Sequence, residues 1–239
     1  MSYASYPPPP YKFERLDKDK AILLIVDHQL GLLQLVKDYT TAEFRNNILA
    51  HAELGKLFSL PTILTTSAEA GPNGPLPKEI TQMYPDAPFI RRNGEVNAWD
   101  NPDFRKAVEA TGRKQVILGG IVTEVCTMFL ALSLREAGYS VWANTEASGT
   151  ATPKLAEDAN RRMENAGVHL TGLFGVAMFL MKDWRNTPGT AEVLPFLDKI
   201  RKLIYLSKQY FPAYGIVARS HGSAKKTGEI VPGQEELLG

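Results

Sequence analysis

Cysteine is nearly absent from this sequence, since Cys126 is the only one among 239 residues. One cysteine cannot form an intramolecular disulfide, which excludes a small secreted scaffold held by disulfides and favours a reducing compartment. An excess of charge of one sign is also absent, because 27 basic side chains stand against 26 acidic ones. Such a balance gives no indication of the basic surface that nucleic acids or acidic membranes attract.

Long apolar runs are missing as well. No stretch of the sequence approaches the roughly 20 apolar residues of a transmembrane helix. The first twenty residues, MSYASYPPPPYKFERLDKDK, lack the apolar core of a secretion signal. We therefore expect a cytoplasmic protein without a membrane or nucleic-acid partner.

Two kinds of segment alternate along the chain. Short apolar runs, several of them rich in β-branched residues, predict strands at 21–27, 62–66, 88–90, 115–120 and 140–148. Segments whose apolar residues recur every three or four positions predict helices at 44–60, 103–112, 124–138 and 154–167. This alternation predicts an α/β fold, in which a mainly parallel sheet is covered by helices on both faces.

The chain shows no internal repeat, and we expect one domain at 11–206. Four consecutive prolines at 7–10 predict an extended arm at 1–10. The segment 207–239 loses periodicity and gains glycine and charge, so we expect a loosely held extension there.

Three chemically distinct side chains fall near the ends of predicted strands. Asp27 ends the first strand, Arg91 and Arg92 follow the strand at 88–90, and the strand at 115–120 leads to Cys126. Ligands of such sheets bind beyond the carboxyl ends of the strands, so we expect these groups to converge. Taken singly, each has a structural explanation, because a lone cysteine usually fills a core and an aspartate often caps a turn.

Taken together, the three side chains predict covalent catalysis. With Thr123 as the N-cap, Cys126 falls in the first turn of a helix, where unpaired N–H groups and the helix dipole favour an anion. We expect this position and a nearby arginine to lower the thiol pKa. Asp27 then takes the thiol proton as the sulfur attacks a carbonyl.

Several longer motifs resemble the isochorismatase-like cysteine hydrolases, and among them the YcaC-like hydrolases. The motifs are LLIVDHQLGLL, LPTILTTSAEAGPNGPL, PDAPFIRRNGEVNAWDN, GIVTEVC, EASGT and MKDWRN, and the similarity runs from about Tyr11 to Leu206. The resemblance implies a three-layer α/β/α sandwich with a six-stranded, mainly parallel sheet. It also implies a small-molecule substrate and self-association into a homo-oligomer such as an octamer.

The resemblance implies roles for individual positions. Of the family's catalytic aspartate, lysine and cysteine, Asp27 matches the base and Cys126 the nucleophile, whereas Arg92 stands where the wider family has lysine. A cis peptide bond between Ile121 and Val122 is implied, which aims the N–H groups of Val122 and Cys126 at an oxyanion. Because arginine stays charged in proteins, Arg92 can attract a thiolate or a substrate oxygen but cannot shuttle a proton.

A substrate pocket beside the cysteine is also expected, lined by Gln29, Asn97, Trp99 and Thr123. Trp99 would supply an apolar wall, although an aromatic residue is more often part of a core.

No metal and no cofactor are expected. The loop after the second predicted strand, SAEAGPNGPLP, lacks the histidines with which related nicotinamidases bind a metal. The four histidines, His28, His51, His169 and His221, form no pair at ligand spacing. His28 adjoins Asp27, but neighbours on a strand point to opposite faces.

The cysteine favours hydrolysis of an amide-type C–N bond through a thioester, since the isochorismate-cleaving relatives lack it. Two alternatives stay open. The protein could be a catalytically silent binding or assembly protein, or a redox-reactive cysteine protein, although the chain has no second cysteine to resolve an oxidised thiol. A nucleotide binder is disfavoured, because DHQLGLL lacks the glycine fingerprint for a pyrophosphate.

Overall fold

The computed structural model of the chain describes residues 13–201 and divides into two compact units, one ending at Asp183 and the other beginning at Trp184. The first unit holds the sheet and most of the helices, and the second contains α7 (Thr190–Arg201). The predicted arm at 1–10 and the predicted extension at 207–239 lie outside the described residues. The domain limits at 11 and 206 lie outside them too, and stay a prediction.

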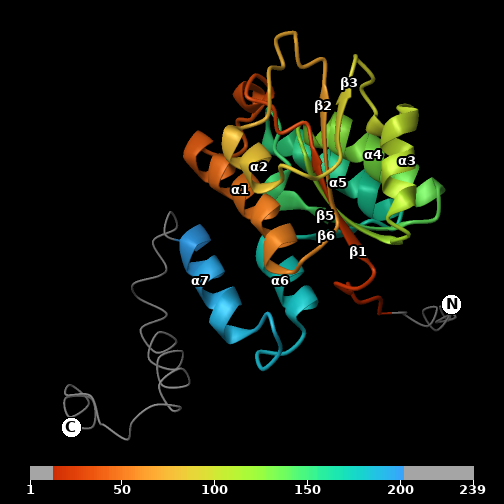
Figure 1. Ribbon diagram of the computed structural model, residues 1–239. Helices are drawn as coiled ribbons and strands as arrows, with labels where there is room; N and C mark the ends of the chain where they lie inside the picture. The colour runs from red at the N-terminus through yellow and green to blue at the C-terminus, as the bar shows by residue number, and fades with distance from the viewer. Residues whose placement is uncertain (1–12, 202–239) are drawn as a thin grey trace, which may run out of the picture. The chain divides into compact units, whose positions relative to one another are not determined.

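A six-stranded sheet forms the centre of the first unit (Figure 1). Its strands are β1 (Ala21–Val26), β2 (Thr62–Ser67), β3 (Phe89–Arg92), β4 (Gln115–Gly120), β5 (Ser140–Asn144) and β6 (His169–Thr171). They lie in the order β3-β2-β1-β4-β5-β6, and every neighbouring pair is parallel. The predicted fold class and the six-stranded parallel sheet are therefore confirmed.

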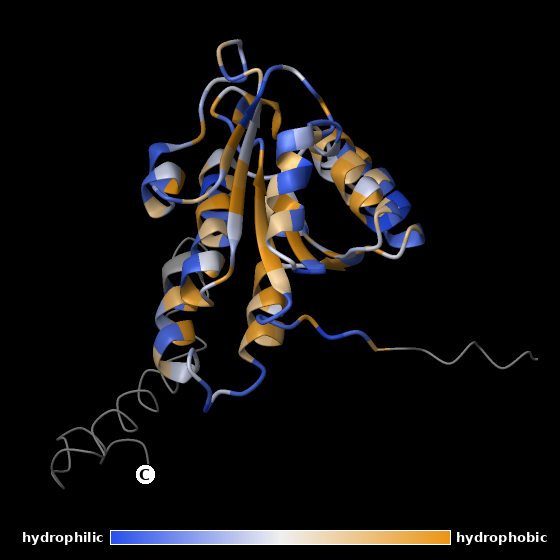
Figure 2. Ribbon diagram, turned by 45° about the vertical axis from the view of Figure 1, so that its right-hand side comes forward, coloured by the Kyte–Doolittle hydropathy of each residue, from blue (hydrophilic) through white to orange (hydrophobic). Residues whose placement is uncertain are grey.

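Helices cover both faces of this sheet. They are α1 (Thr41–Leu57), α2 (Lys78–Met83), α3 (Pro102–Ala110), α4 (Met128–Glu136), α5 (Pro153–Asn165) and α6 (Leu173–Met181). One layer consists of α3, α4 and α5, and the opposite layer of α1, α2 and α6 (Figure 1). Figure 2 shows hydrophobic residues concentrated in the central strands and on α6, and hydrophilic residues on the outer helices and the loops. All residues of β1 and β4 are buried, which explains their unbroken apolar sequence.

The first helix and the third strand differ from their predicted limits. The helix predicted at 44–60 begins at Thr41 instead, because the side chain of Thr40 accepts a hydrogen bond from the Glu43 N–H and caps it. The strand β3 extends to Arg92, so Arg91 and Arg92 belong to the strand rather than follow it. Their alternation along the strand points the two arginines to opposite faces.

Several elements were not predicted. The strand β6 has only three residues, and α2 has only six, so neither carries a periodic pattern. The helix α6 has the sequence LFGVAMFLM, which is apolar on every side and therefore lacks an amphipathic period. The strand predicted at 140–148 ends at Asn144, whose side chain accepts from the Glu146 N–H and starts a short 3₁₀ turn.

Within the described part of the chain, no helix combines the length and the apolar character needed to cross a membrane.

Candidate active site

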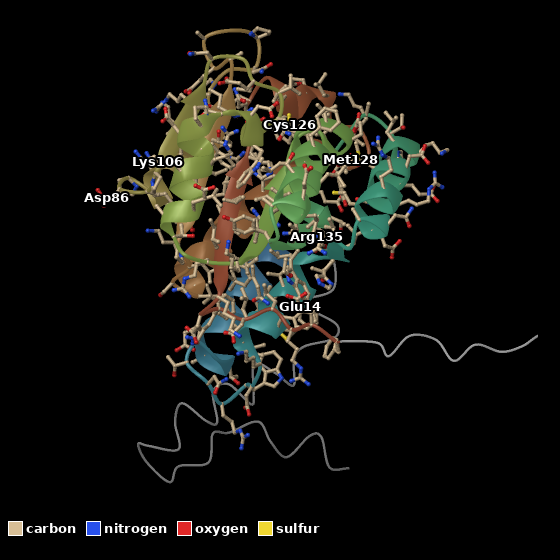
Figure 3. The ribbon with its side chains drawn as sticks, turned by 90° about the vertical axis from the view of Figure 1, so that its right-hand side faces the viewer. Glu14, Asp86, Lys106, Cys126, Met128 and Arg135 are labelled. Atoms are coloured by element: carbon tan, nitrogen blue, oxygen red, sulfur yellow. The ribbon has the colours of Figure 1, made fainter. Side chains whose placement is uncertain are left out.

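Three of the predicted site residues meet at the carboxyl end of the sheet. Asp27 follows β1, Arg92 ends β3, and Cys126 lies in a short π-helical turn, η3 (Thr123–Thr127), that follows β4. Figure 3 shows Cys126 at this end of the unit and Glu14, which precedes β1, toward the other end. The strand order brings β1 and β4 side by side, with β2 between β1 and β3, so residues distant in sequence become neighbours.

Asp27 is buried and held in an unusual backbone conformation. Its φ angle is 55°, in the left-handed region that non-glycine residues rarely adopt, and its N–H donates to the carbonyl oxygen of Thr65 at 3.0 Å. Residues strained in this way cluster at functional sites. Both carboxylate oxygens accept hydrogen bonds from Nη2 of Arg92, and the carboxylate also accepts a hydrogen bond from the Cys126 thiol. Burial raises the pKa of the Asp27 carboxyl, while Arg92 and the thiol act in the opposite direction.

Arg92 is buried, and all three nitrogens of its guanidinium donate hydrogen bonds within the protein. Nε donates to Oγ1 of Thr65 at 3.0 Å, and Nη1 donates to the carbonyl oxygens of Glu95 and of Val96, the latter at 3.4 Å. Nη2 donates to Asp27. The guanidinium is 0% exposed, so a substrate oxygen would reach it only by displacing one of these contacts, and the expected contact of Arg92 with a substrate stays a prediction.

The neighbouring Arg91 differs from Arg92 in its exposure and in its partners. Its side chain is 60% exposed, and its Nε lies 3.1 Å from Oε2 of Glu69. Its guanidinium carbon lies 3.9 Å from the ring centre of Phe89, in a cation–π contact. Arg91 therefore belongs to the outer surface of β3, not to the site.

Cys126 is half-buried. Its thiol donates a hydrogen bond to the Asp27 carboxylate and accepts one from the backbone N–H of Val122. Burial raises the pKa of the thiol, and the negative charge of Asp27 raises it further. Arg92 and the Val122 N–H lower it, but by less. The predicted lowering of the thiol pKa is therefore wrong, because burial of the thiol and then the Asp27 charge raise the pKa by more than Arg92 and the Val122 N–H lower it. The thiol keeps its proton near neutral pH and has a base beside it.

The turn before the cysteine also differs from the expectation in one respect. Val122, not Thr123, is the residue that precedes the π-helical turn, and Thr123 is its first residue. The peptide bond between Ile121 and Val122 is cis, as expected. The Thr123 N–H donates to the carbonyl oxygen of Gly149 at 3.1 Å, which ties this turn to the segment after β5.

Gly120 shows how closely this turn packs. A Cβ atom added there would lie 2.9 Å from the carbonyl oxygen of Val26 and 3.0 Å from Oγ1 of Thr127. Contacts this short are not tolerated, so only glycine lets the end of β4 pass between β1 and η3. The motif GGIVTEVC thus brings Cys126 against the end of β1.

Two of the predicted pocket residues are buried rather than exposed at a pocket. The Gln29 side chain accepts from the Ser67 N–H at 2.8 Å and donates to the carbonyl oxygens of Ser67, at 3.0 Å, and Gly74, at 2.5 Å. Gln29 thus fastens the loop after β2, and its expected place in a substrate pocket stays a prediction. Thr123 is 1% exposed, and its hydroxyl has no hydrogen-bond partner among the described residues.

The other two predicted pocket residues contact elements away from the thiol. Nδ2 of Asn97 donates to Oγ of Ser133 in α4 at 2.9 Å, and Oδ1 accepts from the Trp99 N–H at 3.1 Å. The Trp99 ring lies edge-on to Tyr139, with 5.8 Å between the centroids, and packs against the hydrophobic core. Tyr139 precedes β5 and so lies at the amino end of the sheet. Trp99 thus packs against the core, and its place in a substrate pocket stays a prediction.

Sequence reasoning missed how Arg92 is held. Thr65 and the carbonyl oxygens of Glu95 and Val96 supply three of its acceptors. Thr65 is completely buried in β2, and a polar residue inside an apolar strand was the available signal. The backbone carbonyls carry no signal in the sequence.

The histidines near the site form a separate buried group. Nε2 of His28 lies 2.8 Å from the carbonyl oxygen of Ala147, and Nε2 of His51 lies 3.1 Å from that of Leu24. His28 therefore contacts different partners from its neighbour Asp27. Burial lowers the pKa of His28 to about 3 and that of His51 to about 4. Among residues 13–201, no group of three or more potential ligands is arranged to hold a metal ion.

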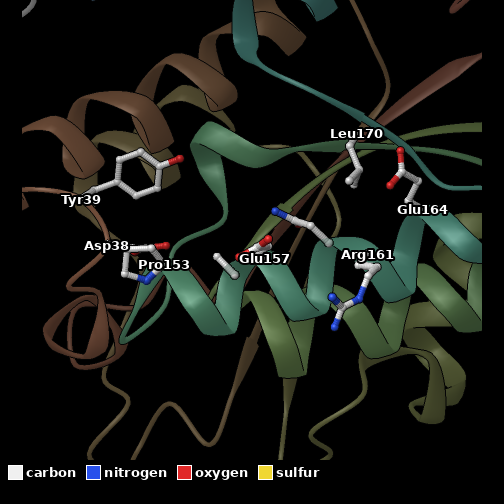
Figure 4. A pocket seen from close by; sticks show the side chains of 9 residues that line it. Asp38, Tyr39, Pro153, Glu157, Arg161, Glu164 and Leu170 are labelled. Carbon is white, nitrogen blue, oxygen red and sulfur yellow. The ribbon is translucent and has the colours of Figure 1, made fainter.

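Four surface cavities have volumes of about 560, 460, 490 and 540 Å³. The first lies between Tyr39 and α5, and its charged lining includes Asp38, Glu157 and Arg161 (Figure 4). None of the four is lined by Asp27, Arg92 or Cys126. The candidate site thus lies outside these four cavities.

Comparisons with known proteins agree with this geometry. The isochorismatase domain family matches residues 21–173, which include all six strands and the Asp27, Arg92 and Cys126 cluster. The probable hydrolase YcaC of Escherichia coli strain K12 is 54% identical over 174 residues, covering 73% of this chain and 84% of that protein.

Two solved structures resemble the chain closely, each with 47% identity and a TM-score of 0.76. One is YcaC from Pseudomonas aeruginosa with hexane-2,5-diol and covalent acrylamide, and the match covers 89% of this chain and 99% of that one. The other is the YcaC gene product of Escherichia coli, an octameric hydrolase of unknown specificity. That match covers 90% of this chain and 99% of the YcaC chain. The chain therefore belongs to the isochorismatase family, in its YcaC-like hydrolase branch.

Proposed function

We propose that this protein is a cysteine hydrolase that cleaves the C–N bond of a small amide-type molecule through a thioester on Cys126. The observation that carries the proposal is the hydrogen bond between a half-buried thiol and the buried carboxylate of Asp27. A nucleophile with a base in hydrogen-bond contact is the arrangement that covalent catalysis requires. The covalent acrylamide in the Pseudomonas aeruginosa relative supports a reactive nucleophile in this branch.

In the first half of the reaction, sulfur attacks the carbonyl carbon while the thiol proton passes to Asp27. The carbon–oxygen double bond opens to an oxyanion, which the N–H groups of Val122 and Cys126 stabilise. The oxyanion then re-forms the double bond, the C–N bond breaks, and Asp27 returns the proton to the leaving nitrogen. The products of this half are an amine or ammonia and a thioester.

In the second half, water attacks the thioester carbon and gives one proton to Asp27. The C–S bond then breaks, and the proton on Asp27 returns to the sulfur. The acid is released, and the thiol and carboxylate are restored. The raised pKa of Asp27 suits this cycle, because a base titrating nearer to the working pH accepts and donates protons more readily.

Arg92 takes part as a positioning residue. It holds both oxygens of Asp27 and is itself held by Thr65 and the carbonyls of Glu95 and Val96. This fixes the carboxylate beside the thiol, and the Arg92 charge opposes the rise in the pKa of Asp27 that burial causes. No proton passes through Arg92, since arginine does not deprotonate in proteins.

The two alternatives have less support. A redox sensor needs an accessible thiol of low pKa, whereas burial and Asp27 raise the pKa of Cys126. A silent assembly protein would have no use for the left-handed backbone of Asp27 or for its contact with the thiol.

We also propose that the chain forms a homo-oligomer and acts in the cytoplasm. The octameric YcaC hydrolase, matched over 90% of this chain, supports the assembly. Light scattering of the full chain would test it, and a monomer at micromolar concentration would contradict it.

The experiment that tests the function is a screen of small uncharged amides, with release of ammonia or amine as the readout. Wild type is compared with Cys126→Ala, Asp27→Asn and, as a matched control on the outer face of β3, Arg91→Gln. We expect turnover in wild type and in the control, and loss of turnover in the first two. Equal turnover in wild type and Cys126→Ala would contradict the proposal.

A further inference from the structure

The charge at the candidate site is balanced within the protein. Asp27 and Arg92 are both 0% exposed and form an ion pair of zero net charge, and the thiol beside them keeps its proton. Arg92 is the only cation that acts on Asp27 within the described part of the chain. An arriving substrate therefore meets no uncompensated positive charge.

The hydrogen-bond donors of Arg92 are likewise paired with acceptors of the protein itself. All three nitrogens of Arg92 already donate within the protein, to Thr65, to Asp27 and to the carbonyl oxygens of Glu95 and Val96. A substrate carboxylate would need at least one charged donor to replace the water that it loses. To obtain it from Arg92, the carboxylate would have to break a buried contact.

The charged group in contact with the thiol is a carboxylate. Asp27 is hydrogen-bonded to the thiol itself. The next arginine along β3, Arg91, is exposed and paired with Glu69. An anion next to the sulfur is therefore close to the Asp27 carboxylate, and the cation that acts on the thiol, Arg92, is already paired with that carboxylate.

We propose that this site selects uncharged electrophiles and rejects carboxylates, with the pairing of Asp27 and Arg92 as the determinant of that selection. The proposal rests on the proposed function and specifies its substrate class. Small neutral amides and related carbonyl compounds enter, and substrates with a carboxylate beside the reacting carbon do not. The neutral acrylamide bound covalently in the Pseudomonas aeruginosa relative is of the accepted class.

The test uses the fact that the chain has one cysteine. The thiol sulfur attacks iodoacetamide and iodoacetate by the same reaction, in which the S–C bond forms, iodide leaves and the thiol proton is released. They differ in one negative charge. The ratio of their alkylation rates is measured by intact mass for the native full-length protein, and for the same protein in denaturant as the reference for an unperturbed thiol.

In the native protein we expect the ratio of iodoacetamide to iodoacetate rates to exceed that of the unfolded chain by about tenfold or more, since charges a few ångströms apart are weakly screened in a buried site. Asp27→Asn leaves Arg92 uncompensated, so the ratio should fall below the wild-type value by about tenfold or more. Arg91→Gln should keep the wild-type ratio within about twofold, since exposed pairs contribute little.

A native ratio equal to or below that of the unfolded chain would overturn the proposal, as would an Asp27→Asn ratio unchanged from wild type. The wild-type comparison needs no variant, so it remains decisive if Asp27→Asn does not fold. A different result would refute the proposed hydrolase function. Selection of the neutral reagent without hydrolysis of any amide would refute the hydrolase, whereas hydrolysis combined with preference for iodoacetate would refute only the selection.

Discussion

Nη2 of Arg92 donates hydrogen bonds to both carboxylate oxygens of Asp27, and neither side chain is exposed to solvent. The pair joins the end of β3 to the end of β1, across the intervening strand β2. Its consequence is a carboxylate fixed in place, with its remaining capacity directed at the Cys126 thiol. Arg92 is thus part of the support of the proposed base.

Breaking this pair from the arginine side should destabilise the protein. Arg92→Met leaves Asp27 buried without a counter-charge, and we expect the free energy of unfolding to fall by about 3–5 kcal/mol. Arg91→Met removes an exposed pair with Glu69 and a surface contact with the Phe89 ring, and should change the free energy of unfolding by less than about 1 kcal/mol. Urea denaturation of both variants checks this. Equal losses would show that burial does not determine the cost.

The thiol should titrate above its ordinary range. Burial and the Asp27 charge raise the pKa of Cys126, so thiolate forms only as the pH rises past the ordinary value of about 8.5. We expect the rate of iodoacetamide alkylation to keep rising above pH 9 in the native protein, while the unfolded chain levels off. The native rate should level off at a lower pH in Asp27→Asn, which lacks the charge. A native plateau below pH 8 would contradict the prediction.

Turnover should depend on the ionisation of Asp27. The carboxylate is the active form, so kcat/KM should rise as the pH increases through the pKa of Asp27, and burial sets that pKa above its usual value of 3.8. The measurement is a pH profile for an amide found in the screen. Asp27→Asn should lose this acid limb together with most of the activity, by about 10²-fold or more. A profile in which activity increases toward low pH would assign a different base.

The two buried histidines should make the fold sensitive to acid. Burial lowers the pKa of His28 to about 3 and that of His51 to about 4, against 6.5 in the unfolded chain. The unfolded chain therefore binds more protons below pH 6.5, and stability present above that pH is lost as the pH falls toward 4.

Each histidine should contribute at most about 1.4 kcal/mol per pH unit to this loss. Urea denaturation between pH 7.5 and 5 measures the slope, and His51→Asn should reduce it by about half. A slope that is unchanged in this variant would indicate that carboxyl groups, rather than these histidines, control acid sensitivity.

Much of the fold could be predicted from local patterns. The runs AILLIV and QVILGG gave the two central strands because both faces of a central parallel strand are buried. Elements without such a pattern were missed. The three residues of β6 and the uniformly apolar α6 owe their structure to their neighbours.

The sequence by itself determined which side chains could react, since strand ends and the motif GGIVTEVC selected Asp27, Arg92 and Cys126. Only the tertiary structure decided their states. Gln29 and Trp99 are engaged by a loop and by the core, and Arg92 by Asp27. The thiol pKa is raised rather than lowered because burial and the proximity of a carboxylate arise only when β1 and β4 lie side by side. Distance and solvent exposure set these energies, and both are properties of the folded chain.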